Sequence, residues 1–404
     1  MYEEVTIGAR LRALRRWRGM SLRTLGDLAD LSQGFLSKVE NGKQPLDRRS
    51  HIAAVAQALQ VSETDLMGGP HLTQDPVQSE PHVHIPALRV ALQTNGIKAA
   101  ATDRARPLAA LVVEVRDGLE PLRRACDYVA IGERLPAVLD ELYVHTAEPA
   151  DELAQRTALE TLVEACVCAT FTAKNLGYPD LAYMAAAQAA DAASHLAEPA
   201  QIGKAAFLRM QTVPKAPQAR TLLMAERAAD ALEPHVNAPG AVEALGMLAL
   251  TASLTAATCY DKAGAEYWLA EAARLAARVP DKPLTNWQSF STANVGVWRV
   301  TVEVERGASG ASVLKLAESV DETSLGRSSR RAAFLADVGR GLARDRRTQA
   351  EALRWLKRAE AVAPQRIRNN AAVRETVGVM LQQAREAAVG RELRGMAARM
   401  GVPH

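Results

Sequence analysis

The feature that most constrains the fold is a run of short, separately capped helical segments between residues 7 and 67. In the first segment Ile7, Leu11 and Leu14 recur at intervals of four and three, which places them on one face of a helix. Gly19 is suited to end that segment, and Ser21 stands where the next helix needs an N-terminal cap. The pattern predicts a small module of packed helices.

Further caps divide the rest of this module. Ser32 precedes a third segment that ends at Asn41-Gly42, a fourth is expected over residues 48–59, and Ser62 caps a short fifth. Only a few residues join the second and third segments, and the third opens with polar side chains. This arrangement is typical of a helix-turn-helix, in which the first helix packs across the second and leaves one face of the second exposed.

Basic residues are concentrated in two parts of this 404-residue chain, although its net charge is only +3. Residues 7–49 contain ten Lys or Arg against four acids, and residues 323–404 contain seventeen against seven. An N-terminal excess suits a surface that contacts phosphates. The role of the C-terminal excess of basic residues stays open, because arginine-rich helices usually just expose those side chains to solvent.

The third segment carries polar side chains on the face that its core does not use. Gln, Lys and Ser can pair with base edges, and glycine allows the helix to approach the groove closely. We therefore expect base contacts from Gln33, Gly34, Ser37 and Lys38. Contacts to the DNA backbone are expected from Arg15, Ser21, Arg23, Asn41 and Lys43.

Residues 7–67 closely resemble the lambda-repressor-like, Xre-family helix-turn-helix. The stretch from Ser32 to Gly42 carries that family's Ser-x-x-x-Leu-Ser-x-Val-Glu-x-Gly signature. The resemblance implies a five-helix domain that binds a double-stranded DNA operator. Two positions depart from it, since Leu22 replaces a DNA-contacting Gln and Trp17 replaces a charged residue. Trp17 is interpreted either as a contact to another domain or subunit or as a partly exposed aromatic.

The composition changes after Met67. Residues 69–86 contain four prolines and few large apolar residues, which predicts a linker between one domain over 1–68 and another over 87–404. His82 and His84 lack further ligands nearby in the sequence, so we expect no metal site. The scattered cysteines are expected to be free, buried thiols in a reducing cytosol: Cys126, Cys166, Cys168 and Cys259.

From residue 88 onward the apolar and alanine positions follow a helical period. One unit is clear, with a helix over 333–343, a turn, and a second helix over 349–363 that Pro364 ends. With the comparable second helices elsewhere included, the leading small residue of each lies at 137, 182, 221, 265, 311 and 352, at intervals of 39 to 46. A period near 40 residues is typical of an α-solenoid, in which each helix pair buries its apolar face against the next. An irregular helical bundle is the alternative. The fold class expected for the chain is thus all-α.

The second domain resembles tetratricopeptide-like repeats over about residues 130 to 365. The whole chain resembles actinobacterial regulators that join an Xre-type head to such a body, as peptide-pheromone-responsive regulators do. The resemblance implies a homodimer formed through the body, and a peptide or small-molecule effector bound on its concave face. Candidate effector contacts are Asn175, Trp287, Asn294 and Trp298, the last three on one face of a helix expected over 284–305. Core aromatics with satisfied neighbours are the alternative interpretation.

No motif of an enzyme is found in the sequence. A Gly-rich phosphate loop, Gly-x-Ser-x-Gly and His-Glu-x-x-His are all missing, and Glu303 and Glu305 are expected on a solvated helix face. No apolar run approaches the ~18 to 20 residues of a membrane span, so we expect no transmembrane helix. We therefore predict a cytoplasmic, cofactor-free, non-enzymatic DNA-binding regulator. Two alternatives stay open: an adaptor whose head has lost DNA binding, and a regulator whose body only dimerises.

Overall fold

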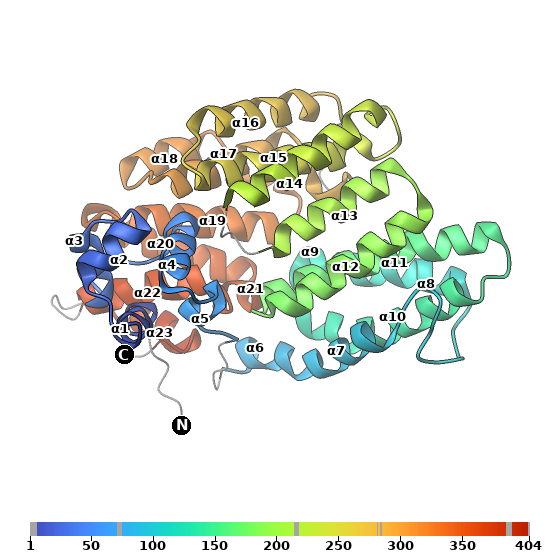
Figure 1. Cartoon of the computed structure of the whole chain (residues 1–404), viewed down its shortest axis with the longest axis horizontal. Coiled ribbons are helices and arrows are strands. Elements are labelled where there is room, and N and C mark those ends of the chain that lie inside the picture. The colour runs from blue at the N-terminus through green and yellow to red at the C-terminus, as the bar shows by residue number, and fades with distance from the viewer. Residues whose placement is uncertain are drawn as a thin grey trace.

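The protein is built from helices and turns. The computed structural model describes residues 6–70, 75–213, 218–280, 282, 285–384 and 390–402. Over these ranges no strand forms, and the one β-bridge joins Gly96 and Ala99. The expected all-α fold is confirmed. Figure 1 shows the first helices (blue) beside the last helices (red) at one end of the molecule.

Residues 6–70, called the head below, fold as the capping pattern predicts. The side chains of Ser21, Ser32 and Ser62 each accept a hydrogen bond from the backbone N–H three residues later. A core separate from that of the rest of the chain is formed by apolar residues from Ile7 to Leu66. The helices are α1 (Ile7–Trp17), α2 (Leu22–Ala29), α3 (Gln33–Glu40), α4 (Arg49–Leu59) and α5 (Glu63–Met67).

The expected linker over 69–86 needs correction, because from Asp75 onward this segment is folded. Gln78 and His82 are buried, and the amide Nε2 of Gln78 donates to Asn369 Oδ1 at 2.6 Å. The two ring nitrogens of His82 lie 2.9 Å from the Tyr178 hydroxyl and 3.0 Å from Asn369 Oδ1. Buried polar side chains hold this segment, so a search for large apolar residues misses it.

The body, residues 75–402, begins with short helices that lead into a long one. They are α6 (Pro76–Ser79), η1 (Glu80–His84), α7 (Ile85–Thr94), α8 (Leu108–Val113), the π-helical η2 (Glu114–Leu119), α9 (Glu120–Ala125) and α10 (Tyr128–Ala147).

Consecutive helices of the remaining chain pack against each other, most extensively α11 with α12, α15 with α16, and α19 with α20. Alanines that face the neighbouring helix, such as Ala182 and Ala186, are fully buried, so these helices approach closely. The elements are α11 (Glu152–Asn175), α12 (Pro179–Leu196), α13 (Pro199–Thr212), α14 (Gln218–Leu232), η3 (Glu233–His235), α15 (Ala241–Thr258), α16 (Lys262–Ala276), η4 (Trp287–Ser289), α17 (Thr292–Arg306), α18 (Ala311–Glu318), η5 (Glu322–Leu325), α19 (Ser328–Ala343), η6 (Arg346–Thr348), α20 (Gln349–Val362), α21 (Pro364–Arg368), α22 (Ala371–Ala384) and α23 (Arg391–Arg399).

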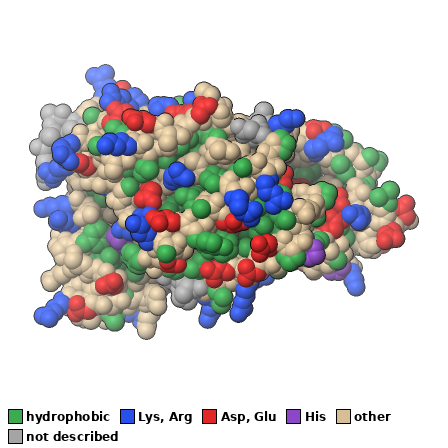
Figure 2. Space-filling view, turned by 90° about the horizontal axis from the view of Figure 1, so that it is seen from above, with side chains coloured by type: hydrophobic (Ala, Val, Ile, Leu, Met, Phe, Trp, Pro, Cys, Tyr) green, Lys and Arg blue, Asp and Glu red, His purple; other side chains and the backbone are tan. Residues whose placement is uncertain are grey.

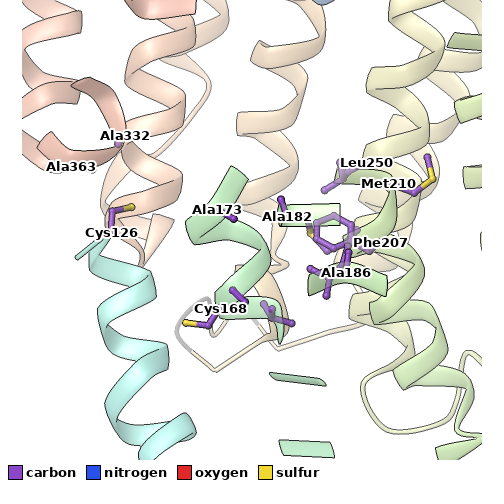
Figure 3. Close-up of a cluster of buried hydrophobic side chains, with 14 of the residues drawn as sticks. Cys126, Cys168, Ala173, Ala182, Ala186, Phe207, Met210, Leu250, Ala332 and Ala363 are labelled. Atoms are coloured by element: carbon purple, nitrogen blue, oxygen red, sulfur yellow. The ribbon is translucent and has the colours of Figure 1, made fainter. Parts of the chain in front are cut away.

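Early and late parts of the body meet. Helix α9 packs against α19, and α6 packs against α21. Figure 3 shows Cys126, at the end of α9, beside the ribbon that carries Ala332, while Ala182 and Phe207 gather further along the same core. One continuous core therefore joins the two ends of the helical array.

Burial raises the pKa of Cys166 and of Cys168 to about 12, so both thiols stay protonated.

Helix α15 corrects the expectation about apolar runs. Its 18 residues have a mean hydropathy of 1.4, enough by length and composition to cross a membrane. However, 83% of the helix is buried inside the protein, and it packs against α13, α14, α16 and α17. Having neighbours on all these sides accounts for its apolar composition.

On the face drawn in Figure 2, basic side chains (blue) and acidic ones (red) are interspersed.

Candidate functional site: the nucleic-acid interface

Helix α3 presents the polar face that the sequence predicts. Leu36 and Val39 are buried in the head core, whereas Gln33, Gly34 and Lys38 are exposed and Ser37 is half-buried. A Cβ built on Gly34 meets no atom within 4 Å, so only open space lies beyond this position. All four predicted base-contacting residues thus belong to one outward-facing helix surface.

Four of the predicted backbone contacts lie around this helix. Ser21, Arg23, Asn41 and Lys43 are all exposed. The Asn41 amide donates to the carbonyl of Ser37 at 2.8 Å, which fixes the end of α3. The side chain of Arg23 makes no hydrogen bond or ion pair with any residue that the structure describes, so its guanidinium is available for a phosphate.

Arg15 does not fit its predicted role. Its side chain is 12% exposed and its Nε and Nη2 donate to the carboxylate of Glu40 at 2.6 and 2.9 Å. Its Nη1 donates to the carbonyl of Met20 at 2.8 Å, and the Glu40 hydrogen bond raises the pKa of Arg15. All three groups are used inside the head, so Arg15 ties α1 to the end of α3 instead of facing DNA. Trp17, which the sequence left open, is 69% exposed and lies under the guanidinium of Arg18.

Asp47, in the loop between α3 and α4, anchors the head to the body. It is 3% exposed, and its Oδ2 lies 2.9 Å from Arg344 Nη2 and 3.4 Å from Arg340 Nη2. Burial alone would raise the pKa of Asp47, but the two guanidinium groups outweigh it and the pKa is lowered. Part of the C-terminal basic excess therefore neutralises an acid of the head.

Glu305 makes a second anchor, and the expected solvated face at Glu303 and Glu305 is wrong for Glu305. It is 1% exposed, and its Oε1 accepts from the backbone N–H of Ser50 at 3.0 Å. Arg49 Nη1 lies 3.3 Å from its Oε2, and Arg48 Nε donates to its carbonyl at 2.7 Å. The start of α4 thus binds a buried carboxylate at the end of α17.

The loop that follows α3 is held by α22. Side-chain amides of Gln382 and Gln383 donate to the carbonyls of Asn41 and Lys43 at 2.8 and 2.9 Å. The backbone N–H of Leu46 donates to Glu375 Oε1 at 3.3 Å, and burial raises the pKa of Glu375 to about 7. The body therefore contacts the segment that is predicted to touch the DNA backbone, while the outward face of α3 stays free.

A cavity of about 660 Å³ lies between head and body beside α3. Burial and the nearby Arg48 lower the pKa of His51, which lines it, to about 4, so this imidazole is neutral at pH 7. The lining is mostly basic or polar: Phe35, Lys38, Lys43, Gln44, Pro45, Asp47, Arg48, His51, Gly307, Ser309, Ala343, Arg344, Arg346, Gln349 and Gln383.

The single helix expected over 284–305 is interrupted; Leu284 itself lies outside the described residues. Trp287 belongs to the short turn η4, in which Gln288 and Ser289 have positive φ angles of 53° and 58°. Helix α17 begins only after Ser291, whose hydroxyl accepts from the backbone N–H of Asn294. The left-handed residues break the helix, and apolar spacing does not reveal them.

Three of the four candidate effector contacts still lie in one region. The Asn294 amide donates to the carbonyl of Gln288 at 3.3 Å, which ties α17 to the turn that carries Trp287. Trp298 follows one turn after Asn294 on α17, and both are buried. Asn175 does not share these contacts, because its side-chain amide donates to the Tyr128 hydroxyl at 2.8 Å.

Sequence reasoning missed three arginines in this region: Arg123, Arg327 and Arg330, called the arginine cluster below. Arg123 Nη1 donates to Gln288 Oε1 at 3.3 Å, and the guanidinium of Arg330 lies 5.6 Å from the ring centre of Trp298. Burial and the neighbouring arginines lower the pKa of Arg327 and of Arg330 to about 9. Some 200 residues separate Arg123 from the other two, so no local motif could have found the cluster.

Comparison with known families agrees with the geometry of the head. Residues 6–67 match the family model of a helix-turn-helix domain. Comparisons with curated proteins and with solved structures gave no match. The N-terminal module is therefore a helix-turn-helix domain, and the protein is in general terms a DNA-binding regulator. Over the described residues, no group of three or more His, Cys, Asp or Glu is arranged to hold a metal ion.

Proposed function

We propose that the protein is a sequence-specific, Xre-type transcriptional regulator of the actinobacterial kind, with a tetratricopeptide-like body. It acts in the cytoplasm as a homodimer, without a catalytic site or cofactor, and its body binds a peptide or small-molecule effector. The observation that carries the proposal is the polar face of α3, because the hydrogen bonds described between body and head reach the loop after α3 and the start of α4, not this face. A face reserved in this way is suited to base edges in the major groove.

Two helices support a link between the effector region and the head. Helix α17 carries Asn294 near its start, Trp298 at its middle and Glu305 near its end. Helix α19 carries Arg330 near its start and Arg340 near its end. Each helix thus runs from the proposed effector region to a residue that anchors the head, so a ligand that favours one placement of these helices also favours one placement of the head.

The proposal is tested by selecting bound duplexes from a random DNA library with the full chain and then measuring Kd against salt. We expect an enriched, two-fold symmetric site whose halves are about one helical turn apart, as a dimer requires. Lys38→Ala is expected to weaken binding to the selected site more than binding to random DNA. A selection that enriches no sequence, or equal losses on both duplexes, would sink the assignment. Light scattering of the full chain tests the dimer separately.

A further inference from the structure

The arginine cluster combines the buried side chains of Arg123 and Arg327 with the half-buried side chain of Arg330. Glu120 Oε1 contacts Arg327 Nη1 at 3.0 Å, while Arg123 donates to both Glu120 oxygens. In contrast, the side chain of Arg330 forms no hydrogen bond or ion pair with any described residue, and the charges of Arg366, Arg327 and Arg123 act on it to lower its pKa. A partly desolvated guanidinium without a counter-charge is unfavourable, and a bound anion would supply that counter-charge.

Buried polar atoms without partners belong to the turn η4, to α17 and to Arg327 of the arginine cluster. Within the described ranges, no hydrogen bond is made by these buried atoms: Arg327 Nε, Gln288 Nε2, Ser289 Oγ, Asn294 Oδ1 and the indole Nε1 of Trp287 and of Trp298. Such atoms are normally paired in a folded protein, and a concentration of unpaired ones calls for a specific explanation. Every atom in this set except Asn294 Oδ1 can donate a hydrogen bond, so together they are suited to an acceptor-rich, anionic group.

The backbone here is held in a conformation that side chains disfavour. Gln288 and Ser289 are consecutive left-handed residues, and their side chains are among the unpaired ones. Arg123 and Asn294 each bind Gln288, which keeps the turn in place. Strained non-glycine residues of this kind concentrate at ligand-binding sites.

Aromatic rings beside the arginine cluster indicate what kind of apolar group a bound anion would carry. Trp287 packs edge-on against Phe207 with ring centres 5.3 Å apart, and Lys204 Nζ lies 5.6 Å from the Trp287 ring. Arg123 lies over the ring of Phe171 at 5.7 Å. Trp287 and Phe171 are only half-buried, so both offer surface to a flat apolar group.

We infer that the centre of the body binds a small, flat organic acid, whose anionic group pairs with Arg327 and Arg330 and whose apolar part packs on Trp287. The inference rests on the proposed effector function and specifies its ligand as an anion. Trp298 precedes Glu305 by seven residues on α17, and Arg330 precedes Arg340 by ten on α19, which at 1.5 Å per residue is roughly 10 and 15 Å. The acid therefore binds at one end of the two helices whose other ends hold the head.

The test uses the full chain and three probes: phenylacetate, phenyl phosphate, and phenylacetamide as the neutral isostere of phenylacetate. Each is titrated through the millimolar range at constant ionic strength while the Tm is recorded. At about tenfold above Kd, we expect an anionic probe to raise the Tm by roughly 1 to 2 °C and phenylacetamide to leave it unchanged. The two anionic probes distinguish a carboxylate ligand from a phosphate.

Variants assign the effect to the cluster. Arg330→Gln should abolish the response, whereas Arg274→Gln, at an exposed arginine paired with Glu271 on α16, should retain it. Arg330→Met, which keeps an apolar stem over Trp298, should raise the Tm of the free protein because it removes an uncompensated charge. This second measurement needs no ligand, so it still tests the inference if Arg330→Gln does not fold.

The inference is overturned if phenylacetamide stabilises as much as phenylacetate, if neither anion acts, or if Arg330→Gln responds like the parent chain. Native mass spectrometry of protein isolated from its own host separates the two proposals. A neutral ligand released from it would contradict the anion site and leave the effector function standing. Release of an acid, together with the expected Tm shifts, would support both.

Discussion

Asp47 of the head and Arg344 of the body are joined through Oδ2 and Nη2 at 2.9 Å, in an interface that leaves the carboxylate almost without solvent. Arg340 approaches the same oxygen at 3.4 Å and also pairs with Asp337 at 2.8 Å. The head is therefore held against the body by buried charge, while its apolar core is separate from that of the body. A contact of this kind depends on both partners, because either one alone is a desolvated ion.

Asp47→Asn should release the head. Removing the carboxylate leaves Arg340 and Arg344 facing each other, and we expect the free energy of unfolding to fall by roughly 3 kcal/mol. Hydrogen exchange should show the loss of protection concentrated in residues 41–50. Asp345→Asn, at a carboxylate whose partner Arg347 is largely exposed, is the matched control and should change little. Unchanged protection at the interface in Asp47→Asn would contradict the anchoring role.

Glu375→Gln should change how stability depends on pH. Because the pKa of Glu375 is raised to about 7 in the fold from an ordinary 4.5, folding favours its protonated form. The contribution of the protonated carboxyl group to the free energy of unfolding is fully present below pH 4.5 and is lost as the pH rises through 7. The variant should match the parent chain at pH 4.5 and exceed it by roughly 2 kcal/mol at pH 8, because an amide oxygen still accepts from Leu46. Denaturant titrations at both pH values measure this.

The control for that experiment is Glu392→Gln, at a largely exposed glutamate that pairs with Lys357 on the surface. It should leave the difference between the two pH values as it is in the parent chain. A Glu375→Gln variant less stable than the parent at pH 8 would show that the ionised carboxylate is the favoured form.

Arg15→Ala and Arg23→Ala should have opposite signatures. Arg15→Ala deprives Glu40, which is 4% exposed, of its closest partner, so the head should lose roughly 2 kcal/mol of stability. Arg23→Ala should leave stability within about 0.5 kcal/mol and lower the salt dependence of DNA binding by about one phosphate contact. A reduced salt slope with unchanged stability in Arg15→Ala would restore Arg15 as a DNA contact.

Gly34→Ala and Gly8→Ala separate the roles of two helical glycines. A Cβ at Gly34 meets no atom within 4 Å, so alanine there should stabilise the head by up to about 1 kcal/mol and still weaken operator binding, because it faces the groove. A Cβ at Gly8 would lie 2.2 Å from the carbonyl oxygen of Val39, so the same change should destabilise the head. Thermal melts and Kd for the selected duplex measure both. Undiminished DNA affinity in Gly34→Ala would remove this glycine from the interface.

The head was largely predictable from its sequence. Its helix boundaries depend on local rules, and Ser21, Ser32 and Ser62 each cap the helix that the pattern assigns to them. The exposed face of α3 follows from the same periodicity. The partner of Arg15 did not follow, because Glu40 lies 25 residues away and only the crossing of α1 and α3 brings the two together.

The body was predictable as helical but not in its contacts. Its small-residue spacing located α12, α16 and α20 correctly, because that spacing follows from close helix packing. The fold of residues 75–86, the break at Gln288 and the burial of Glu305 all depend on polar partners far away in sequence. Such partners leave no periodic trace, so these features become visible only in three dimensions.

The anchoring of the head by Asp47 and by Glu305 has a consequence for engineering. A chimaera that grafts residues 1–68 onto an unrelated body would carry Asp47 without its two guanidinium partners and the start of α4 without its carboxylate. Reprogramming the operator preference should therefore proceed by exchanging only the outward side chains of α3. We therefore expect the proposed DNA-sequence preference to be transferable through the outward side chains of α3 and not through the head as a whole.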